Sequence, residues 1–149
     1  MPRIERHANV LWEGNLARGT GRISAGTGAF EALAYSNAVR IGKGKEGKTS
    51  PEELLAAAHA GCFASSLAGE LTRAGAPPDR LDVTSNVVMD EVEGKGHLIV
   101  ASELRVRARV PGIDEDAFRR VVAEADDGCS FSALIKASAK VTIDAELEG

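Results

Sequence analysis

The sequence of 149 residues contains only two cysteines, Cys62 and Cys129. Two cysteines are too few for the disulfide framework that stabilises many small secreted domains. The three histidines show no metal-ligand spacing, and no Cys-x-x-Cys pair is present, so we expect no metal site. The remaining alternatives are two inert thiols, one reactive thiol or a redox pair.

The chain also lacks an excess of positive charge, since its net charge at pH 7 is −4. Nucleic-acid-binding surfaces are usually basic, so we expect no nucleic-acid partner. No uninterrupted apolar run approaches the roughly 20 residues that span a bilayer. The N-terminal residues 1–14 are charged and do not resemble a signal peptide. These absences predict a cytoplasmic protein with no membrane partner.

The length and the hydrophobic content of 44% predict a single domain, residues 1–149, with an apolar core. Glycine-broken extended segments predict strands at 7–16, 20–24 and 37–41. Alternating apolar residues predict two long antiparallel strands within 80–94 and 97–112, and a last strand within 137–149. Together with the predicted helices, this order of strands predicts an α+β fold.

The segment from Thr49 to Leu71, TSPEELLAAAHAGCFASSLAGEL, carries the clearest helix signal. Ser50 is a suitable N-cap, Pro51 suits the first helical position, and Glu53 completes a capping box. The helix should end near Ala74, before a glycine and two prolines. Its many alanines and glycines allow close packing, so we expect it in the interior. A second helix should follow Asp114 and end at Gly128, and a short one should cover 131–136.

A cysteine inside a helix is more often a small packing residue than a nucleophile, so composition alone favours a structural Cys62. Cys129 follows a helix end, where the chain is usually more mobile than in a core. His59 lies one turn before Cys62, where it would act as a base or, more commonly, pack and bond locally. Spacing alone does not decide whether the two thiols meet.

The motif around Cys62 closely resembles the central motif of the OsmC/Ohr proteins, the osmotically inducible and organic hydroperoxide resistance peroxidases. The segments LWEGN, RGTGRIS and SNAVRIG resemble the OsmC branch, and VPGID and GCSFSALIKASAKVTIDAEL continue the resemblance to the end. The resemblance implies an OsmC-like fold, with antiparallel sheets around a buried central helix in an intertwined homodimer. One departure is visible, since Ser130 follows Cys129 where many relatives have proline.

The resemblance implies that Cys62 is the peroxidatic cysteine and Cys129 the resolving cysteine, with Arg40 and Glu52 as the motif arginine and glutamate. It also implies a lipoyl-type dithiol as the external reductant and no cofactor. An arginine beside a sulfur favours the thiolate that attacks peroxide. A carboxylate would hold that arginine through a bidentate pair. Further apolar residues are candidates for a hydroperoxide pocket, with core packing as the alternative: Phe63, Phe131, Phe30 and Leu55.

Helix geometry separates the two halves of this site. Glu52 and Cys62 lie ten residues apart, which is about 15 Å along a helix axis at the usual rise per residue. We therefore expect Arg40 and Glu52 of one chain to serve the cysteines of the other chain. The predicted function is reduction of organic hydroperoxides, and of hydrogen peroxide less well. The alternatives are a redox-sensing or small-molecule-binding module of the same fold without turnover, and a structural protein with two buried thiols.

Overall fold

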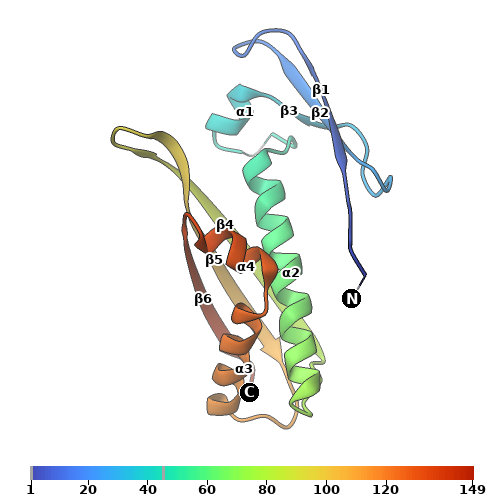
Figure 1. Cartoon of the computed structure of the whole chain (residues 1–149), viewed down its shortest axis with the longest axis vertical. Coiled ribbons are helices and arrows are strands. Elements are labelled where there is room, and N and C mark those ends of the chain that lie inside the picture. Colours follow the sequence, from blue (N-terminus) through green and yellow to red (C-terminus); the bar gives the residue numbers. More distant parts are fainter. Residues whose placement is uncertain (1, 45) are drawn as a thin grey trace. The chain divides into compact units, whose positions relative to one another are not determined.

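The computed structural model describes residues 2–44 and 46–149 and divides the chain into two compact units, residues 1–54 and 55–149 (Figure 1). The prediction of a single domain stays a prediction. The predicted α+β class of the fold is confirmed, because each unit combines helices with a three-stranded sheet.

The N-terminal unit contains the sheet β1-β2-β3, formed by β1 (Ala8–Glu13), β2 (Thr20–Ala25) and β3 (Leu33–Tyr35). Both pairings are antiparallel, as predicted for the first two strands. The strand predicted at 37–41 is wrong, because these residues form the short helix α1 (Asn37–Ile41). The Ser36 hydroxyl accepts a hydrogen bond from the Val39 N–H, and this cap starts a helix despite the β-branched residues.

Helix α2 (Pro51–Arg73) begins and ends close to the predicted residues. The Ser50 hydroxyl accepts the N–H of Glu53 at 3.1 Å, which forms one half of the predicted capping box. The Glu53 carboxylate instead accepts a hydrogen bond from the Thr49 hydroxyl at 2.9 Å. Gly75 ends the segment with a φ of 81°, a left-handed conformation that favours glycine.

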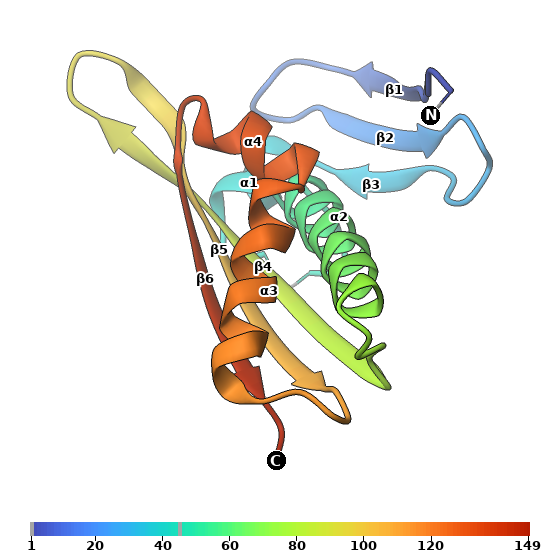
Figure 2. The same ribbon diagram turned by 60° about the horizontal axis from the view of Figure 1, so that its bottom comes forward.

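The C-terminal unit contains the sheet β4-β5-β6, formed by β4 (Arg80–Val92), β5 (Gly96–Arg109) and β6 (Lys140–Leu147). The pairing of β4 with β5 is antiparallel, as predicted. The expectation of purely antiparallel sheets is wrong for β6, which pairs with β5 in parallel. Parallel neighbours need a long crossover, and here it carries α3 (Glu115–Asp127) and α4 (Ser130–Lys136) (Figure 2).

The core of this unit lies between one face of the sheet and the helices. It is formed mainly by Phe63, Leu67 and Leu71 of α2, the alternate residues Leu104, Val106 and Ala108 of β5, and Phe118 of α3. Only one face of α2 is buried, however, at His59, Phe63, Leu67 and Leu71. The opposite stripe of small residues, Ala57, Gly61, Ser65 and Gly69, is exposed. The expectation of an interior helix therefore holds for one side of α2 only.

Among the described residues, α2 is also the one helix that is long and apolar enough, by length and composition alone, to cross a membrane. This differs from the expectation that no segment would qualify, since alanines raise the mean hydropathy without forming an uninterrupted apolar run. The same test is passed by core helices of globular proteins. Of the most apolar window of α2, 22% is buried, and this buried stripe packs in the core of the C-terminal unit.

Candidate active site

Cys62 lies at the margin of the buried face of α2. The residues of that face recur every four positions, so each lies close to one turn after the last. Phe63, the neighbour of Cys62, is fully buried, whereas Cys62 itself is half-buried and packs against the edge of the core. The helix thus supports the sulfur with rigid packing and leaves it partly accessible.

Cys129 lies at the junction of α3 and α4, and it is only 1% exposed. Its sulfur accepts a hydrogen bond from the Ser132 N–H at 3.5 Å, so the cysteine is the N-cap of α4. The expectation of a loosely held thiol at a helix end is therefore wrong, because Cys129 belongs to the core cluster and caps a helix.

The two cysteines lie in the same part of the C-terminal unit, because Cys62 packs against the core cluster that contains Cys129 and its sulfur lies 3.7 Å from the hydroxyl of Ser130. Burial raises the pKa of Cys62, but several groups at the start of α4 lower it by donating hydrogen bonds: the Phe131 N–H, the Cys129 thiol, and the hydroxyl and N–H of Ser130. The net pKa of Cys62 lies below its ordinary value. The C-terminal unit therefore contains a partly accessible thiol with a lowered pKa and, in the cluster it packs against, a second, buried thiol.

Arg40 and Glu52 meet within the N-terminal unit. Arg40 Nε and Nη2 lie 2.9 Å and 2.6 Å from the same oxygen, Oε1 of Glu52. The predicted bidentate pair is thus replaced by two donors on one oxygen. The hydrogen bond to Glu52 raises the pKa of Arg40. Burial raises the pKa of Glu52, but the hydrogen bond from Arg40 and further donors bring it below its ordinary value.

A cavity of about 250 Å³ lies beside Arg40 within the N-terminal unit. Its wall includes Trp12 and Tyr35, whose ring centroids lie 5.6 Å apart, and it is completed by Leu16 and Asn37. Nothing in the sequence connects these residues with Arg40, because they come from two strands, a turn and a helix that only the fold brings together.

The four predicted pocket residues lie in different surroundings. Phe63 is fully buried in the core, and Phe131 is half-buried against it at the start of α4. Leu55 is half-buried on α2, and Phe30 is half-buried in the turn between β2 and β3. Of these, Phe131 is the one whose backbone contributes to the surroundings of the Cys62 sulfur.

His59 is a site residue whose contacts the sequence did not predict. It is fully buried, and its two ring nitrogens lie 2.6 Å and 2.8 Å from the hydroxyls of Ser102 and Ser132. Its position one turn before Cys62 was the only sequence signal. No group of three or more histidine, cysteine or acidic residues that could hold a metal occurs within residues 2–44 and 46–149.

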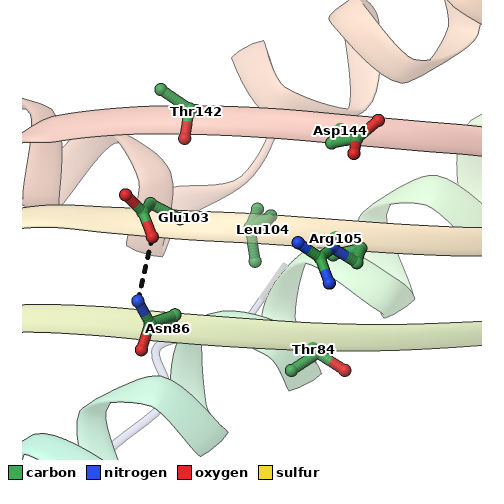
Figure 3. Close-up of a pocket in the computed structure, with 7 residues that line it drawn as sticks. All are labelled: Thr84, Asn86, Glu103, Leu104, Arg105, Thr142 and Asp144. Carbon is green, nitrogen blue, oxygen red and sulfur yellow. Dashed lines mark hydrogen bonds between the residues drawn. The ribbon is translucent and has the colours of Figure 1, made fainter.

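A larger hollow of about 550 Å³ lies on the exposed face of the C-terminal sheet (Figure 3). It is lined by polar side chains, including Asn86 and Glu103, which form a hydrogen bond of 2.9 Å. No cysteine lines it, so we place the site at the thiols rather than at the larger hollow.

Comparison with known proteins identifies the family of the chain. Residues 42–144 match the family model described as OsmC-like protein. The chain is 36% identical over 145 residues to the peroxiredoxin OsmC of Escherichia coli K12, covering 97% of this chain and 98% of that protein. The chain belongs to the OsmC family. The matched segment of this OsmC-like chain includes Glu52, Cys62 and Cys129, and Arg40 lies just before it.

Two further similarities connect the chain with organic hydroperoxide resistance proteins. It is 29% identical over 127 residues to the protein of that name from Xanthomonas axonopodis pv. citri, covering 83% of this chain and 84% of that protein. A crystal structure of an organic hydroperoxide resistance protein OsmC from Legionella pneumophila superposes with a TM-score of 0.72 at 22% identity. That match covers 98% of this chain and 99% of the other, and it confirms the OsmC-like fold.

Proposed function

We propose that the protein is a thiol-dependent peroxidase that reduces organic hydroperoxides, and hydrogen peroxide less well, through Cys62 and Cys129. The observation that carries the proposal is a partly accessible Cys62 sulfur packed against the core cluster that contains the buried Cys129, 3.7 Å from the hydroxyl of Ser130. A thiolate attacks peroxide far faster than a thiol does. The names of two relatives, a peroxiredoxin and an organic hydroperoxide resistance protein, support the same chemistry.

The reaction proceeds in two steps on the enzyme. The Cys62 thiolate attacks one peroxide oxygen, an S–O bond forms, the O–O bond breaks, and the alkoxide leaves and takes up a proton as an alcohol. The sulfur is now a sulfenic acid. Cys129 attacks it, an S–S bond forms and water leaves, so the oxidised enzyme carries a disulfide. Two electrons from an external dithiol, which the family resemblance implies is of the lipoyl type, return both thiols.

Arg40 and Glu52 complete this site in the proposal. A guanidinium donates hydrogen bonds to the leaving oxygen and stays charged at every relevant pH. The two hydrogen bonds from Arg40 to one Glu52 oxygen fix its orientation. The cavity beside Arg40, with its aromatic wall, would receive the organic part of the hydroperoxide. Phe131, Phe30 and Leu55 are proposed as further apolar contacts, whereas the full burial of Phe63 favours core packing.

The active enzyme is proposed to be a homodimer in which one chain supplies Arg40 and Glu52 and the other supplies both cysteines. Each half of the site is assembled within one unit, Arg40 with Glu52 in residues 1–54 and Cys62 with Cys129 in residues 55–149. The exposed small-residue face of α2 leaves room for close approach of a second copy. A cytoplasmic location and the absence of membrane and nucleic-acid partners remain predictions from the sequence.

Steady-state consumption of cumene hydroperoxide with a dithiol reductant tests the activity, with hydrogen peroxide as the comparison substrate. Wild-type protein should turn over repeatedly, Cys62→Ser should not react, and Cys129→Ser should react once and then stop. A single oxidation of wild-type protein without turnover would favour the sensing alternative instead. No reaction of Cys62 with either peroxide would contradict both.

Mixed dimers test the shared site. A dimer of one Arg40→Gln chain and one Cys62→Ser chain has one intact site if the residues come from different chains, and none if they come from the same chain. We expect such heterodimers to recover about half of the wild-type activity, because one of two symmetric sites is intact. The parent homodimers, assayed alone, should remain nearly inactive.

A further inference from the structure

His59 connects three elements of the C-terminal unit through buried hydrogen bonds. Its Nδ1 lies 2.6 Å from the hydroxyl of Ser102 on β5, and its Nε2 lies 2.8 Å from the hydroxyl of Ser132 on α4. The Ser102 hydroxyl lies 3.0 Å from that of Ser85 on β4. One imidazole on α2 therefore links that helix both to the sheet and to α4.

The surroundings of His59 favour its neutral form. Burial lowers its pKa, the Asp126 carboxylate of α3 opposes this, and the Lys136 ammonium of α4 adds to it. A neutral imidazole has one donor and one acceptor nitrogen, and serine hydroxyls both donate and accept. The chain of hydrogen bonds is therefore satisfied in either direction. Because both ring nitrogens are engaged and the residue is fully buried, His59 does not act as a base toward substrate.

One of the two serines that His59 contacts, Ser132, lies in the first turn of α4, the turn near the Cys62 sulfur. Ser132 is the third residue of α4, and its N–H donates to the Cys129 sulfur at 3.5 Å. Of the two residues before it, Ser130 has its hydroxyl 3.7 Å from the Cys62 sulfur, and the N–H groups of Ser130 and Phe131 lower the pKa of Cys62. His59 itself precedes Cys62 by one turn of α2. A bond from His59 to Ser132 thus joins the helix of one cysteine to the helix capped by the other.

We propose that His59 is a positioning residue, which holds the first turn of α4 against α2 and so fixes the Cys129 sulfur and the donors of Ser130 and Phe131 beside Cys62. Its importance for turnover rests on the proposed peroxidase function, whereas its effect on the Cys62 thiolate does not. The His59 ring is held by hydrogen bonds at both nitrogens, so it positions its partners more rigidly than a long, flexible polar side chain would. Loss of the hydrogen bond from His59 to Ser132 or to Ser102 leaves a buried polar group without a partner. We expect the first turn of α4 to shift so that this group finds a new partner.

Two variants and one matched control test this role. Ser132→Ala removes the bond to α4, and His59→Leu removes the whole connection. Ser66→Ala is the control, because the Ser66 hydroxyl also joins α2 to a neighbouring helix segment, by a hydrogen bond of 2.7 Å to the Ala125 carbonyl. For each protein, the alkylation rate of Cys62 by iodoacetamide is measured against pH, with peptide mass spectrometry to separate Cys62 from Cys129 and thermal melting to establish folding.

The expected result is a higher midpoint pH for Cys62 in Ser132→Ala and His59→Leu, with alkylation at pH 7 slower by about two- to tenfold, the range for one lost hydrogen bond. Ser66→Ala should keep the wild-type midpoint even if it melts earlier. An unchanged midpoint in Ser132→Ala, or an equal shift in Ser66→Ala, would overturn the proposal; if His59→Leu does not fold, Ser132→Ala decides alone. Failure of wild-type protein to consume peroxide would refute the proposed function but leave this measurement valid.

Discussion

The hydroxyl of Ser130 lies 3.7 Å from the sulfur of Cys62, at the position where the family resemblance implies a proline in many relatives. Proline offers neither a hydroxyl nor a backbone N–H. Both of these groups of Ser130 contribute to lowering the pKa of Cys62. Relative to the proline that the family resemblance implies, Ser130 therefore adds hydrogen-bond donors near the Cys62 sulfur.

Removing the Ser130 hydroxyl should raise the pKa of Cys62. In Ser130→Ala we expect the alkylation of Cys62 at pH 7 to slow by about two- to fivefold, since one weak hydrogen bond to the thiolate is lost. Ser138→Ala, an exposed substitution beyond the end of α4, is the control and should match wild type. A Ser130→Ala protein with wild-type alkylation rates at every pH would show that the hydroxyl is not a donor to the sulfur.

Oxidation should loosen the start of α4. The Cys129 sulfur caps this helix by accepting the Ser132 N–H, and a sulfur that has joined a disulfide with Cys62 is displaced from that role. Hydrogen–deuterium exchange of residues 130–133 should therefore be faster in the oxidised protein than in the reduced one. The first turn of α3, capped by Asp114, should exchange equally in both states. Equal protection of 130–133 in the two states would contradict this.

Arg40 and Glu52 should affect catalysis more than stability. Arg40 is partly exposed, and ion pairs of this kind contribute about 0–1 kcal/mol to folding. In Arg40→Gln we expect kcat/KM for cumene hydroperoxide to fall by about 100-fold or more, the usual cost of removing one donor to a developing oxyanion. Glu52→Gln, which retains the side-chain shape, should lose less. Melting temperatures near wild type, measured in parallel, separate this effect from unfolding.

Substitution of Phe63 should mainly lower stability, whereas substitution of Phe131 should mainly change substrate binding. Phe63 is fully buried, so Phe63→Ala should cost about 3–5 kcal/mol of unfolding free energy. Phe131 is half-buried beside the reactive sulfur, and Phe131→Leu should change KM for bulky hydroperoxides with a smaller loss of stability. Denaturant unfolding and steady-state kinetics on both variants distinguish the two roles. Phe131→Leu kinetics identical to wild type would leave Phe131 as a packing residue.

The neutral state of His59 predicts an acid-dependent loss of stability. Its folded pKa is lowered from the ordinary 6.5, so below that pH the unfolded chain binds a proton that the folded chain does not. The unfolding free energy of wild type should therefore decline as the pH falls below about 6.5. The decline should be smaller in His59→Leu. Parallel curves for the two proteins across this range would mean that His59 is protonated in the folded state as readily as in the unfolded chain.

Much of the fold followed from local signals. The Ser50 cap with Pro51, the alternation along β5 and the Asp114 cap each depend on neighbours in the sequence, and each appears where it was predicted. The errors arose where distant or subtle contacts decide. The apolar, β-branched segment of α1 reads as a strand, but one hydroxyl of Ser36 caps it as a helix. The parallel direction of β6 depends on a crossover that no local pattern specifies.

For the site, the residue types were predictable and their surroundings were not. The resemblance indicated Cys62 and Cys129, but the donors to the Cys62 sulfur come from the start of α4, residues whose spacing carries no signal of contact. Likewise, the bonds of His59 reach Ser102 and Ser132, which are 43 and 73 residues away. Only the folded chain places these groups together.

The parallel pairing of β6 with β5 also bears on how the chain matures during synthesis. Strand β5 pairs with β4 through a short hairpin, but its other edge must wait for the strand that follows Cys129. Helix α4 packs on β6, so it cannot reach its final position before β6 has formed. Docking of α4, and with it the burial of the second thiol, therefore has to wait until the last strand of the chain is free to pair with β5.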